Sequence, residues 1–196
     1  MKKQSNRIAS RVCVLVGACL LMIAVLLPFL WQWGVHSSAQ KIEDCVRIIR
    51  NLIPEPQSAV PEARRDNTMS ILSLNGTNYV GILEIPRYDS ALPVCANWGE
   101  VSKHPCRLSG SVYDRTIQLG GTSQKGQYDF YREISVGDAV YFTDMEGNRY
   151  SYTVTDICYE KHADQTALQR KETALTLFIK NVYAFEYIII FCMPAD

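Results

Sequence analysis

Two apolar runs near the C-terminus, Leu175–Ile179 and Tyr187–Phe191, are separated by the short segment Lys180–Glu186. Both runs are rich in β-branched and aromatic residues and are too short for helices, so they predict two buried strands. The residues at the end of the first strand and the start of the second are Lys180 and Tyr187. Enzymes often carry catalytic groups at such strand–loop junctions, and these two side chains are therefore candidate functional residues.

Further short extended segments, separated by turn residues, precede this pair. They predict strands over residues 79–86, 91–94, 116–119, 136–143 and 149–157. Residues 144–148 predict a turn between the last two of these strands, and the polar segment Thr122–Gln127 predicts a loop. A helical turn is predicted within Trp98–Pro105, and one short helix within the polar segment Cys158–Thr173. Many short strands with turn signals indicate a mainly β domain, a barrel or sandwich with short helices.

The N-terminal segment has the pattern of a membrane anchor. Residues 1–11 carry four basic and no acidic side chains, and Val12–Leu30 carries no charge. As a helix this run is long enough to span the hydrocarbon core, and Trp31 and Trp33 follow at its end, where indoles prefer the interface. We therefore expect a single-pass plasma-membrane protein with a transmembrane helix over residues 12–33, a cytoplasmic N-terminus and an extracytoplasmic C-terminal domain. The alternative is a cleaved signal peptide, but no A-x-A-type cleavage site follows the run.

Residues 34–68 connect this anchor to the β domain, which occupies residues 69–196. Apolar residues recur at helical spacing in Ser37–Ile53, and Pro54 ends the pattern. Two interpretations are open for this amphipathic helix, which could dock on the domain or a partner, or could be a stalk that continues from the membrane. Pro54–Thr68 contains three prolines and mixed charges, which is typical of a linker.

Composition excludes several classes of function. The twenty basic and twenty acidic residues cancel, so the net charge indicates no nucleic-acid partner. The seven cysteines form neither a C-x-x-C pair nor a zinc-type spacing, and the sequence therefore predicts no metal and no cofactor. Two readings are open for Cys95 and Cys106: a disulfide, if the domain is extracytoplasmic, or unpaired and mostly buried thiols.

Several motifs follow one another in a single collinear order: Tyr79–Pro86, Leu92–Val94, the run HPCRLSGSVY at His104–Tyr113, the run FTDMEGN at Phe142–Asn148, Tyr150–Val154 and Leu175–Phe178. Together with the anchor and linker, this order resembles the sortases, the membrane-anchored cysteine transpeptidases of Gram-positive bacteria. The resemblance covers most of residues 79–192. It implies an eight-stranded β-barrel on the outer face of the membrane.

The resemblance also identifies three positions at which sortases carry a catalytic histidine, cysteine and arginine. Gly121 stands where the histidine would follow its strand, and Lys180 stands where the cysteine would end the strand over residues 176–180. Tyr187 stands where the arginine would open the last strand, and a shift of one residue would put Glu186 there. All three catalytic positions are therefore replaced, and we expect Lys180 and Gly121 to lie near each other at one end of the barrel.

These replacements remove the family's chemistry. A lysine amine that attacked the peptide carbonyl would form a stable amide that nothing resolves, and glycine supplies no proton carrier. The sequence therefore predicts an inactive sortase-like protein that binds an LPxTG-type sorting peptide, a pilin-like surface protein or an active sortase. The residues expected to line what remains of the peptide groove are Thr122, Ser123, His162, Lys180 and Glu186.

Two further hypotheses are retained. The first is an active cysteine transpeptidase that builds pili or anchors surface proteins through a relocated thiol, for which the candidates are Cys95, Cys106, Cys158 and Cys192. In this hypothesis His104 is the imidazole closest in sequence to a candidate thiol, Cys106. The second is a decayed paralogue whose barrel still folds but has no present role.

Overall fold

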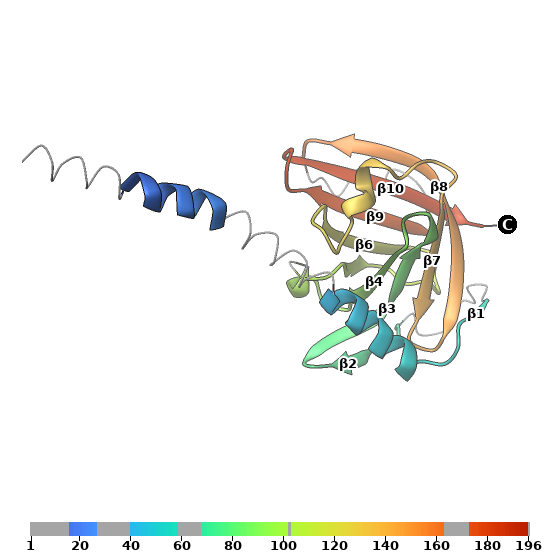
Figure 1. The fold of residues 1–196 in the computed structure, drawn as a ribbon. Helices are drawn as coiled ribbons and strands as arrows, with labels where there is room; N and C mark the ends of the chain where they lie inside the picture. Colours follow the sequence, from blue (N-terminus) through green and yellow to red (C-terminus); the bar gives the residue numbers. More distant parts are fainter. Residues whose placement is uncertain (1–15, 27–39, 59–67, 102, 163–172, 196) are drawn as a thin grey trace, which may run out of the picture. The chain divides into compact units, whose positions relative to one another are not determined.

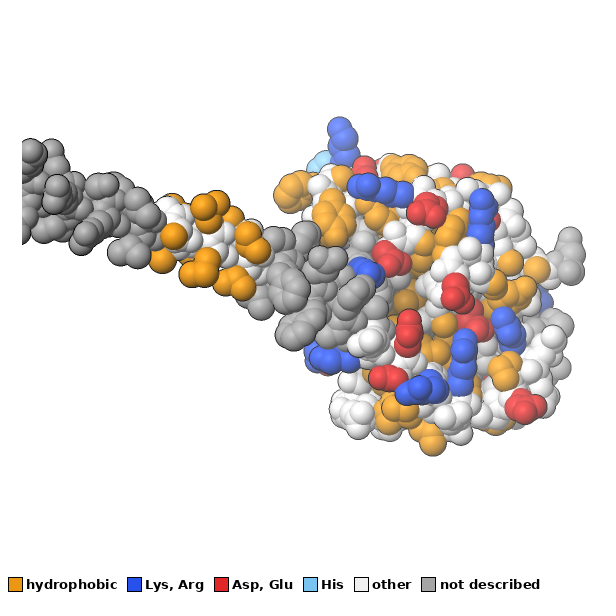
Figure 2. Space-filling model, in the orientation of Figure 1, with side chains coloured by type: hydrophobic (Ala, Val, Ile, Leu, Met, Phe, Trp, Pro, Cys, Tyr) orange, Lys and Arg blue, Asp and Glu red, His pale blue; other side chains and the backbone are white. Residues whose placement is uncertain are grey.

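The computed structural model describes residues 16–26, 40–58, 68–101, 103–162 and 173–195. The chain divides into two units, Met1–Gln40 and Lys41–Asp196. In the first unit, residues 16–26 form an α-helix whose large apolar side chains are exposed, as Figure 2 shows for the face in view. No helix within the described ranges is both long and apolar enough to cross a membrane. The predicted anchor over residues 12–33 and the N-terminal segment 1–11 lie partly or wholly outside the described residues.

The second unit is built on a closed barrel of eight strands (Figure 1). Hydrogen-bonded neighbours follow one another in the circuit β3–β4–β5–β6–β9–β10–β8–β7 and back to β3. The mainly β barrel expected from the sequence is therefore confirmed. The strands of the circuit are β3 (Thr77–Ile85), β4 (Ser90–Cys95), β5 (Cys106–Ser109), β6 (Ile117–Thr122), β7 (Ala139–Asp144), β8 (Asn148–Glu160), β9 (Leu175–Asn181) and β10 (Glu186–Pro194).

Two short strands and three short 3₁₀ helices complete the described elements. Strand β1 (Gln57–Ser58) pairs in parallel with β8, and β2 (Leu72–Leu74) pairs antiparallel with β3. A part of the predicted linker is thus paired to the barrel. The 3₁₀ helices are η1 (Pro86–Tyr88), η2 (Trp98–Glu100) and η3 (Asp129–Arg132).

Apolar side chains along the strands point alternately into the barrel interior and onto its outer face. On β9, Leu175, Leu177 and Ile179 belong to the main core, whereas Phe178 belongs to a second apolar cluster. This is the two-residue period of a strand, whose successive side chains point to opposite faces. The second cluster consists of the buried Phe178, Ile189 and Phe191, against which Leu108, Cys158 and Tyr187 pack.

The structure corrects the predicted extents of several strands. Strand β6 continues through two glycines to Thr122, and β8 continues to Glu160. Glycine and polar residues have low strand propensity, but ladder bonds to β9 and β10 continue past them. Strand β5 was not predicted, because four residues are too few for a clear pattern and they become a strand through their pairing with β4 and β6. The helix expected within residues 158–173 falls largely on residues 163–172, which lie outside the described part of the chain.

The amphipathic segment forms a helix over residues 40–52 that docks on the barrel wall. Val46 and Ile49 are buried in one cluster with Tyr79 and Ile82 of β3. At the edge of this contact Arg50 donates to Glu84 over 2.6 Å. Of the two interpretations of this helix, the structure therefore supports docking on the domain.

Candidate functional site at the ends of β6, β9 and β10

Three of the predicted site residues, Thr122, Lys180 and Tyr187, lie in a row that crosses neighbouring strands and ends at Glu160. Thr122 of β6 pairs with Lys180 of β9, Lys180 pairs with Tyr187 of β10, and Tyr187 pairs with Glu160 of β8. Directly paired residues on neighbouring strands point to the same face of a sheet. The row Thr122–Lys180–Tyr187–Glu160 therefore lies along one face, at the end of the barrel where these strands stop.

This face is the outside of the barrel. Lys180 lies between Ile179 and Asn181, which are both buried, and its own side chain is exposed. One row further into the sheet, the ring of Phe178 stacks on that of Tyr187, with 5.1 Å between ring centroids and 17° between planes. Since Phe178 belongs to the outer cluster, Lys180 presents its ammonium group on the outer surface, beside a packed apolar layer.

Gly121 lies next to this row but faces the core. Its register partner is Ile179, whose side chain is buried in the main core. A Cβ atom added to Gly121 would lie 2.5 Å from Cε2 of Tyr128, a fully buried residue whose pKa is raised by burial. The expectation that Gly121 and Lys180 are neighbours is confirmed by the register. The residue of β6 whose side chain lies on the same face as Lys180, however, is its register partner Thr122, one residue after Gly121.

The predicted groove residues Ser123 and Glu186 hold the neighbouring loop in place. The backbone N–H of Ser123 donates to the Lys180 carbonyl over 3.0 Å, and its buried hydroxyl accepts from the N–H of Val182 over 3.1 Å. The carboxylate of Glu186 accepts from the side-chain amide of Asn181 over 2.9 Å. The loop between β9 and β10 is thus tied to both strands. No described residue forms an ion pair with Lys180.

The same loop presents aromatic side chains to solvent. Tyr183 is 63% exposed and Phe185 is 95% exposed, and Phe185 has a left-handed backbone with φ of 48°. A non-glycine residue with positive φ is uncommon outside turns. The loop therefore exposes two aromatic rings close in sequence to Lys180, a feature that its apolar composition alone did not reveal.

The candidate relocated thiols lie elsewhere. Cys95, Cys106 and Cys192 are fully buried, and burial raises the pKa of Cys192 to about 12. Cys158 is partly exposed on the outer face, where it pairs with Ile189. It lies on β8, two strands away from Lys180, which is about 10 Å across the sheet. None of these thiols occupies the row.

The two described histidines are also separate from the row. His162 is exposed and follows the end of β8 by two residues. His104 was considered as a partner of Cys106, but the Cys106 thiol donates to the backbone carbonyl of His104 over 3.3 Å. The imidazole itself packs edge-on against the ring of Tyr79, with 5.7 Å between centroids. The Cys106–His104 couple is therefore not formed through the imidazole.

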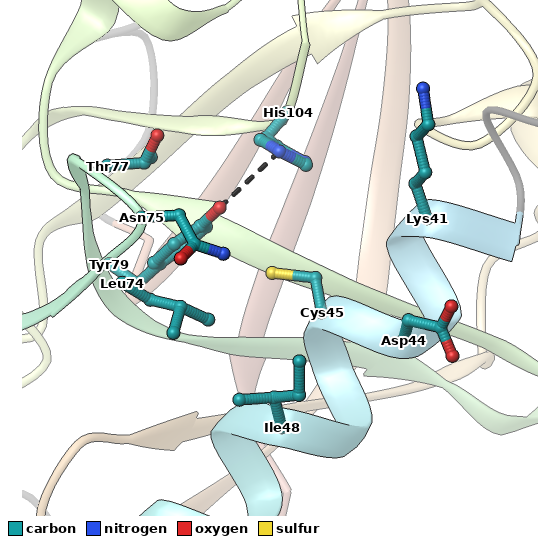
Figure 3. A pocket seen from close by; sticks show the side chains of 9 residues that line it. All are labelled: Lys41, Asp44, Cys45, Ile48, Leu74, Asn75, Thr77, Tyr79 and His104. Atoms are coloured by element: carbon teal, nitrogen blue, oxygen red, sulfur yellow. Dashed lines mark hydrogen bonds between the residues drawn. The ribbon is translucent and has the colours of Figure 1, made fainter.

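A cavity of about 300 Å³ lies where the helix over residues 40–52 meets the barrel (Figure 3). The hydroxyl of Tyr79 lies 3.5 Å from Nε2 of His104, and Cys45 of the helix lines the same space. Burial raises the pKa of Cys45 and lowers that of His104, so both groups are held in their neutral forms. A raised thiol pKa and a lowered imidazole pKa both disfavour transfer of the thiol proton to the imidazole, so these two groups make a poor nucleophile–base couple. The cavity is lined by Lys41, Asp44, Cys45, Ile48, Leu74, Asn75, Thr77, Tyr79 and His104.

No protein-family model matches this chain, and no curated protein sequence matches it. Solved structures of sortases do resemble it. Sortase A from Corynebacterium diphtheriae superposes with a TM-score of 0.52 at 18% identity, over 61% of this chain and 62% of that one. Sortase C1 from Streptococcus agalactiae superposes with a TM-score of 0.51 at 18% identity, over 63% of this chain and 71% of that one. Sortase A from Listeria monocytogenes superposes with a TM-score of 0.50 at 20% identity, over 60% of this chain and 88% of that one.

These similarities identify the fold of the described barrel as that of the sortases. The matched part spans less than two thirds of the length of the corynebacterial structure.

Proposed function

We propose that this protein is a sortase-fold binding protein without transpeptidase activity, held at the outer face of the plasma membrane by residues 12–33. The observation that carries the proposal is the row Thr122–Lys180–Tyr187. The resemblance found in the sequence places a thiol at Lys180, a guanidinium at Tyr187 and an imidazole at Gly121, which is the residue before Thr122. Lys180 and Tyr187 supply an amine and a phenol instead, Gly121 has no side chain, and Thr122 adds a hydroxyl to the row.

This set of groups cannot perform the transpeptidation chemistry. An acyl group transferred to the Lys180 amine would form an amide. Neither water nor a second amine cleaves an amide readily, because the amine is a poor leaving group. The row contains no imidazole, which is the group that most often shuttles protons in reactions of this kind. Loss of a catalytic unit of this kind typically lowers the rate on the order of 10⁶-fold.

The same groups suit binding. Lys180 offers an exposed ammonium group, and Tyr183 and Phe185 offer aromatic surface on a loop that is tied down by Ser123 and Glu186. Aromatic residues are enriched among the residues that dominate binding energy at protein interfaces, and a preorganised loop loses little entropy on binding. We infer that the partner is an extended peptide of the LPxTG type, presented by a surface or pilin-like protein. An active sortase that carries its own substrate is the alternative partner.

The test uses the full chain in detergent micelles with a fluorescent LPxTG-type peptide. We expect saturable binding without cleavage or transfer, and we expect Lys180→Ala to weaken binding about tenfold, the loss of one well-placed charged contact. Arg47→Ala is the matched control, because it also removes an exposed positive charge, from the outer side of the docked helix. Cleavage of the peptide would overturn the proposal, and absence of any binding would favour the decayed paralogue.

The relocated-thiol hypothesis has one candidate with solvent access among the four cysteines considered. Cys158 is partly exposed and lies on the same outer face as Lys180, whereas the other three thiols are buried. If the wild-type chain cleaves the peptide, Cys158→Ala should abolish that activity while Cys192→Ala leaves it unchanged. Activity that survives Cys158→Ala would exclude this version of the enzyme hypothesis.

A further inference from the structure

The junction between β4 and β5 is the weakest seam of the barrel. The two strands run parallel and share one register pair, Cys95 with Cys106. Every other pair of neighbours in the barrel circuit is joined by at least three register pairs. The seam is supplemented by one backbone bond, from the N–H of Cys95 to the carbonyl of Pro105 over 2.8 Å. The two strands are thus held together at the point where both carry a cysteine.

The spacing of Cys95 and Cys106 across the two strands is compatible with a disulfide bond. Neighbouring strands lie about 4.8 Å apart, and disulfides bridge Cα atoms separated by about 4.4 to 6.8 Å. Because register partners point to the same side of a sheet, the two cysteine side chains project to the same side of the seam. The neighbouring Cys106 thiol, together with burial, raises the pKa of Cys95. Both side chains are completely buried in one apolar cluster.

We propose that Cys95 and Cys106 form a disulfide bond in the exported protein, which closes the β4–β5 seam. The oxidant is a second disulfide, that of an extracytoplasmic thiol oxidoreductase or, in vitro, oxidised glutathione. One cysteine thiolate attacks this disulfide, forms a mixed disulfide and releases one thiolate. The other cysteine thiolate then attacks the protein sulfur of the mixed disulfide, forms the Sγ–Sγ bond and releases the second thiolate. The two electrons lost by the cysteines reduce the oxidant, and their two protons pass to solvent or to the released thiolates.

The bond would fix a segment that touches both regions described above. The segment between the two cysteines carries Trp98, whose ring lies over Gly120 on the outer face of β6, so that a Cβ atom there would be 2.4 Å from the indole. It also carries His104, which lines the cavity beneath the docked helix. A covalent link at the base of the segment therefore limits the motion of both side chains.

The other described cysteines are less well placed to be partners. Cys192 is buried in the main core, and Cys158 packs in the outer cluster. Cys45 packs against the cluster that contains Cys95 and Cys106, but from the separate helix over residues 40–52. Cys19 belongs to the other unit of the chain, Met1–Gln40. Within the described part of the unit Lys41–Asp196, Cys45 is therefore the competing thiol that the test must distinguish.

The experiment uses the full chain in detergent, refolded with oxidised glutathione and, in parallel, with a phosphine reductant. Remaining thiols are alkylated with N-ethylmaleimide in denaturant and located by peptide mapping. We expect two fewer alkylated residues than the seven cysteines of the chain, and a linked peptide pair containing Cys95 and Cys106. We also expect the reductant to lower the Tm by about 5–10 °C, because the link restricts the unfolded chain.

Two variants serve as controls for the thermal shift. In Cys192→Ala, which removes a buried thiol elsewhere in the barrel, the redox-dependent shift should persist. In Cys95→Ser/Cys106→Ser the shift should disappear. Seven alkylated cysteines after oxidative refolding, or a link between Cys45 and either partner, would overturn the proposal. Mapping on the wild-type chain gives this answer even if a variant fails to fold, and it does not depend on whether the chain binds a peptide.

Discussion

Thr122 and Lys180 are register partners across the parallel ladder of β6 and β9, and both face the outside of the barrel. Gly121 pairs with Ile179 and faces the core instead. A strand alternates its faces with a period of two, so a shift of one residue exchanges the inner and outer sets. A histidine side chain would therefore lie beside residue 180 if it replaced Thr122, but not if it replaced Gly121.

The contrast between Gly121 and Thr122 predicts different costs of substitution. Gly121→Ala should lower the free energy of unfolding by about 1–3 kcal/mol, because the new methyl group would overlap the ring of the buried Tyr128. Thr122→Ala should change it by less than about 0.5 kcal/mol, since Thr122 lies on the partly exposed outer face. Urea unfolding of the two variants measures the difference. Equal effects would show that Gly121 does not face the core.

Lys180→Cys tests the exposure of the site. The new thiol should react rapidly with a chromogenic disulfide reagent in the native state, because the Lys180 side chain is exposed. The wild-type chain is the control, because it sets the background from the exposed Cys19 and the partly exposed Cys45 and Cys158, while its buried Cys95, Cys106 and Cys192 should not react. A native-state rate no faster than that of the wild-type chain would mean that position 180 is covered.

Rebuilding the missing groups tests the register directly. We expect Lys180→Cys/Thr122→His/Tyr187→Arg to cleave an LPxTG-type peptide about 100-fold faster than Lys180→Cys alone, because an imidazole at position 122 can exchange protons with the thiol. The matched variant carries Gly121→His in place of Thr122→His and should show no such gain, because that imidazole would point into the core. Equal activity of the two triple variants would contradict the assignment.

The docked helix offers a matched pair of neighbouring isoleucines. Ile49 is completely buried against the barrel, whereas Ile48 is 40% exposed. Ile49→Ala should therefore lower the free energy of unfolding by about 2–4 kcal/mol, and Ile48→Ala should lower it by about 1 kcal/mol or less. Chemical denaturation monitored by tryptophan fluorescence would compare them. Similar losses for both variants would argue against docking through the Ile49 face.

His104 predicts a dependence of stability on pH. Burial lowers the pKa of its imidazole below the ordinary value of 6.5, assisted by Lys103 and opposed by Glu100. The unfolded state then binds a proton more readily than the folded state does. This contribution is fully present above about pH 6.5 and is lost as the pH falls below it, with a slope of at most about 1.4 kcal/mol per pH unit.

Unfolding measured between pH 5 and 7 tests this pH dependence. His104→Gln should flatten the stability profile in that range, because it removes the buried titrating group. His162→Gln is the matched control, since His162 is exposed, and it should leave the slope unchanged. An unaltered slope in His104→Gln would show that other groups cause the pH dependence.

The local sequence was sufficient to predict the class of fold and most of its strands. The alternating pattern of β3 is typical of a half-buried strand, and the continuous apolar runs of β9 and β10 are typical of strands buried on both faces. The positions of Lys180 and Tyr187 at a strand end and a strand start were predicted from the same patterns. The collinear order of the motifs added the prediction of a closed barrel, which the topology confirms.

Only the tertiary structure decided which of these residues face one another. The outward position of Thr122, the pairing of Cys95 with Cys106 and the docking of Ile49 all depend on contacts between separate elements of the chain. Strand β5 was missed for the same reason, since its few residues become a strand only between β4 and β6. Local propensity indicates that a residue is in a strand, but the register between strands determines which face it occupies, and a slip of one residue reverses that face.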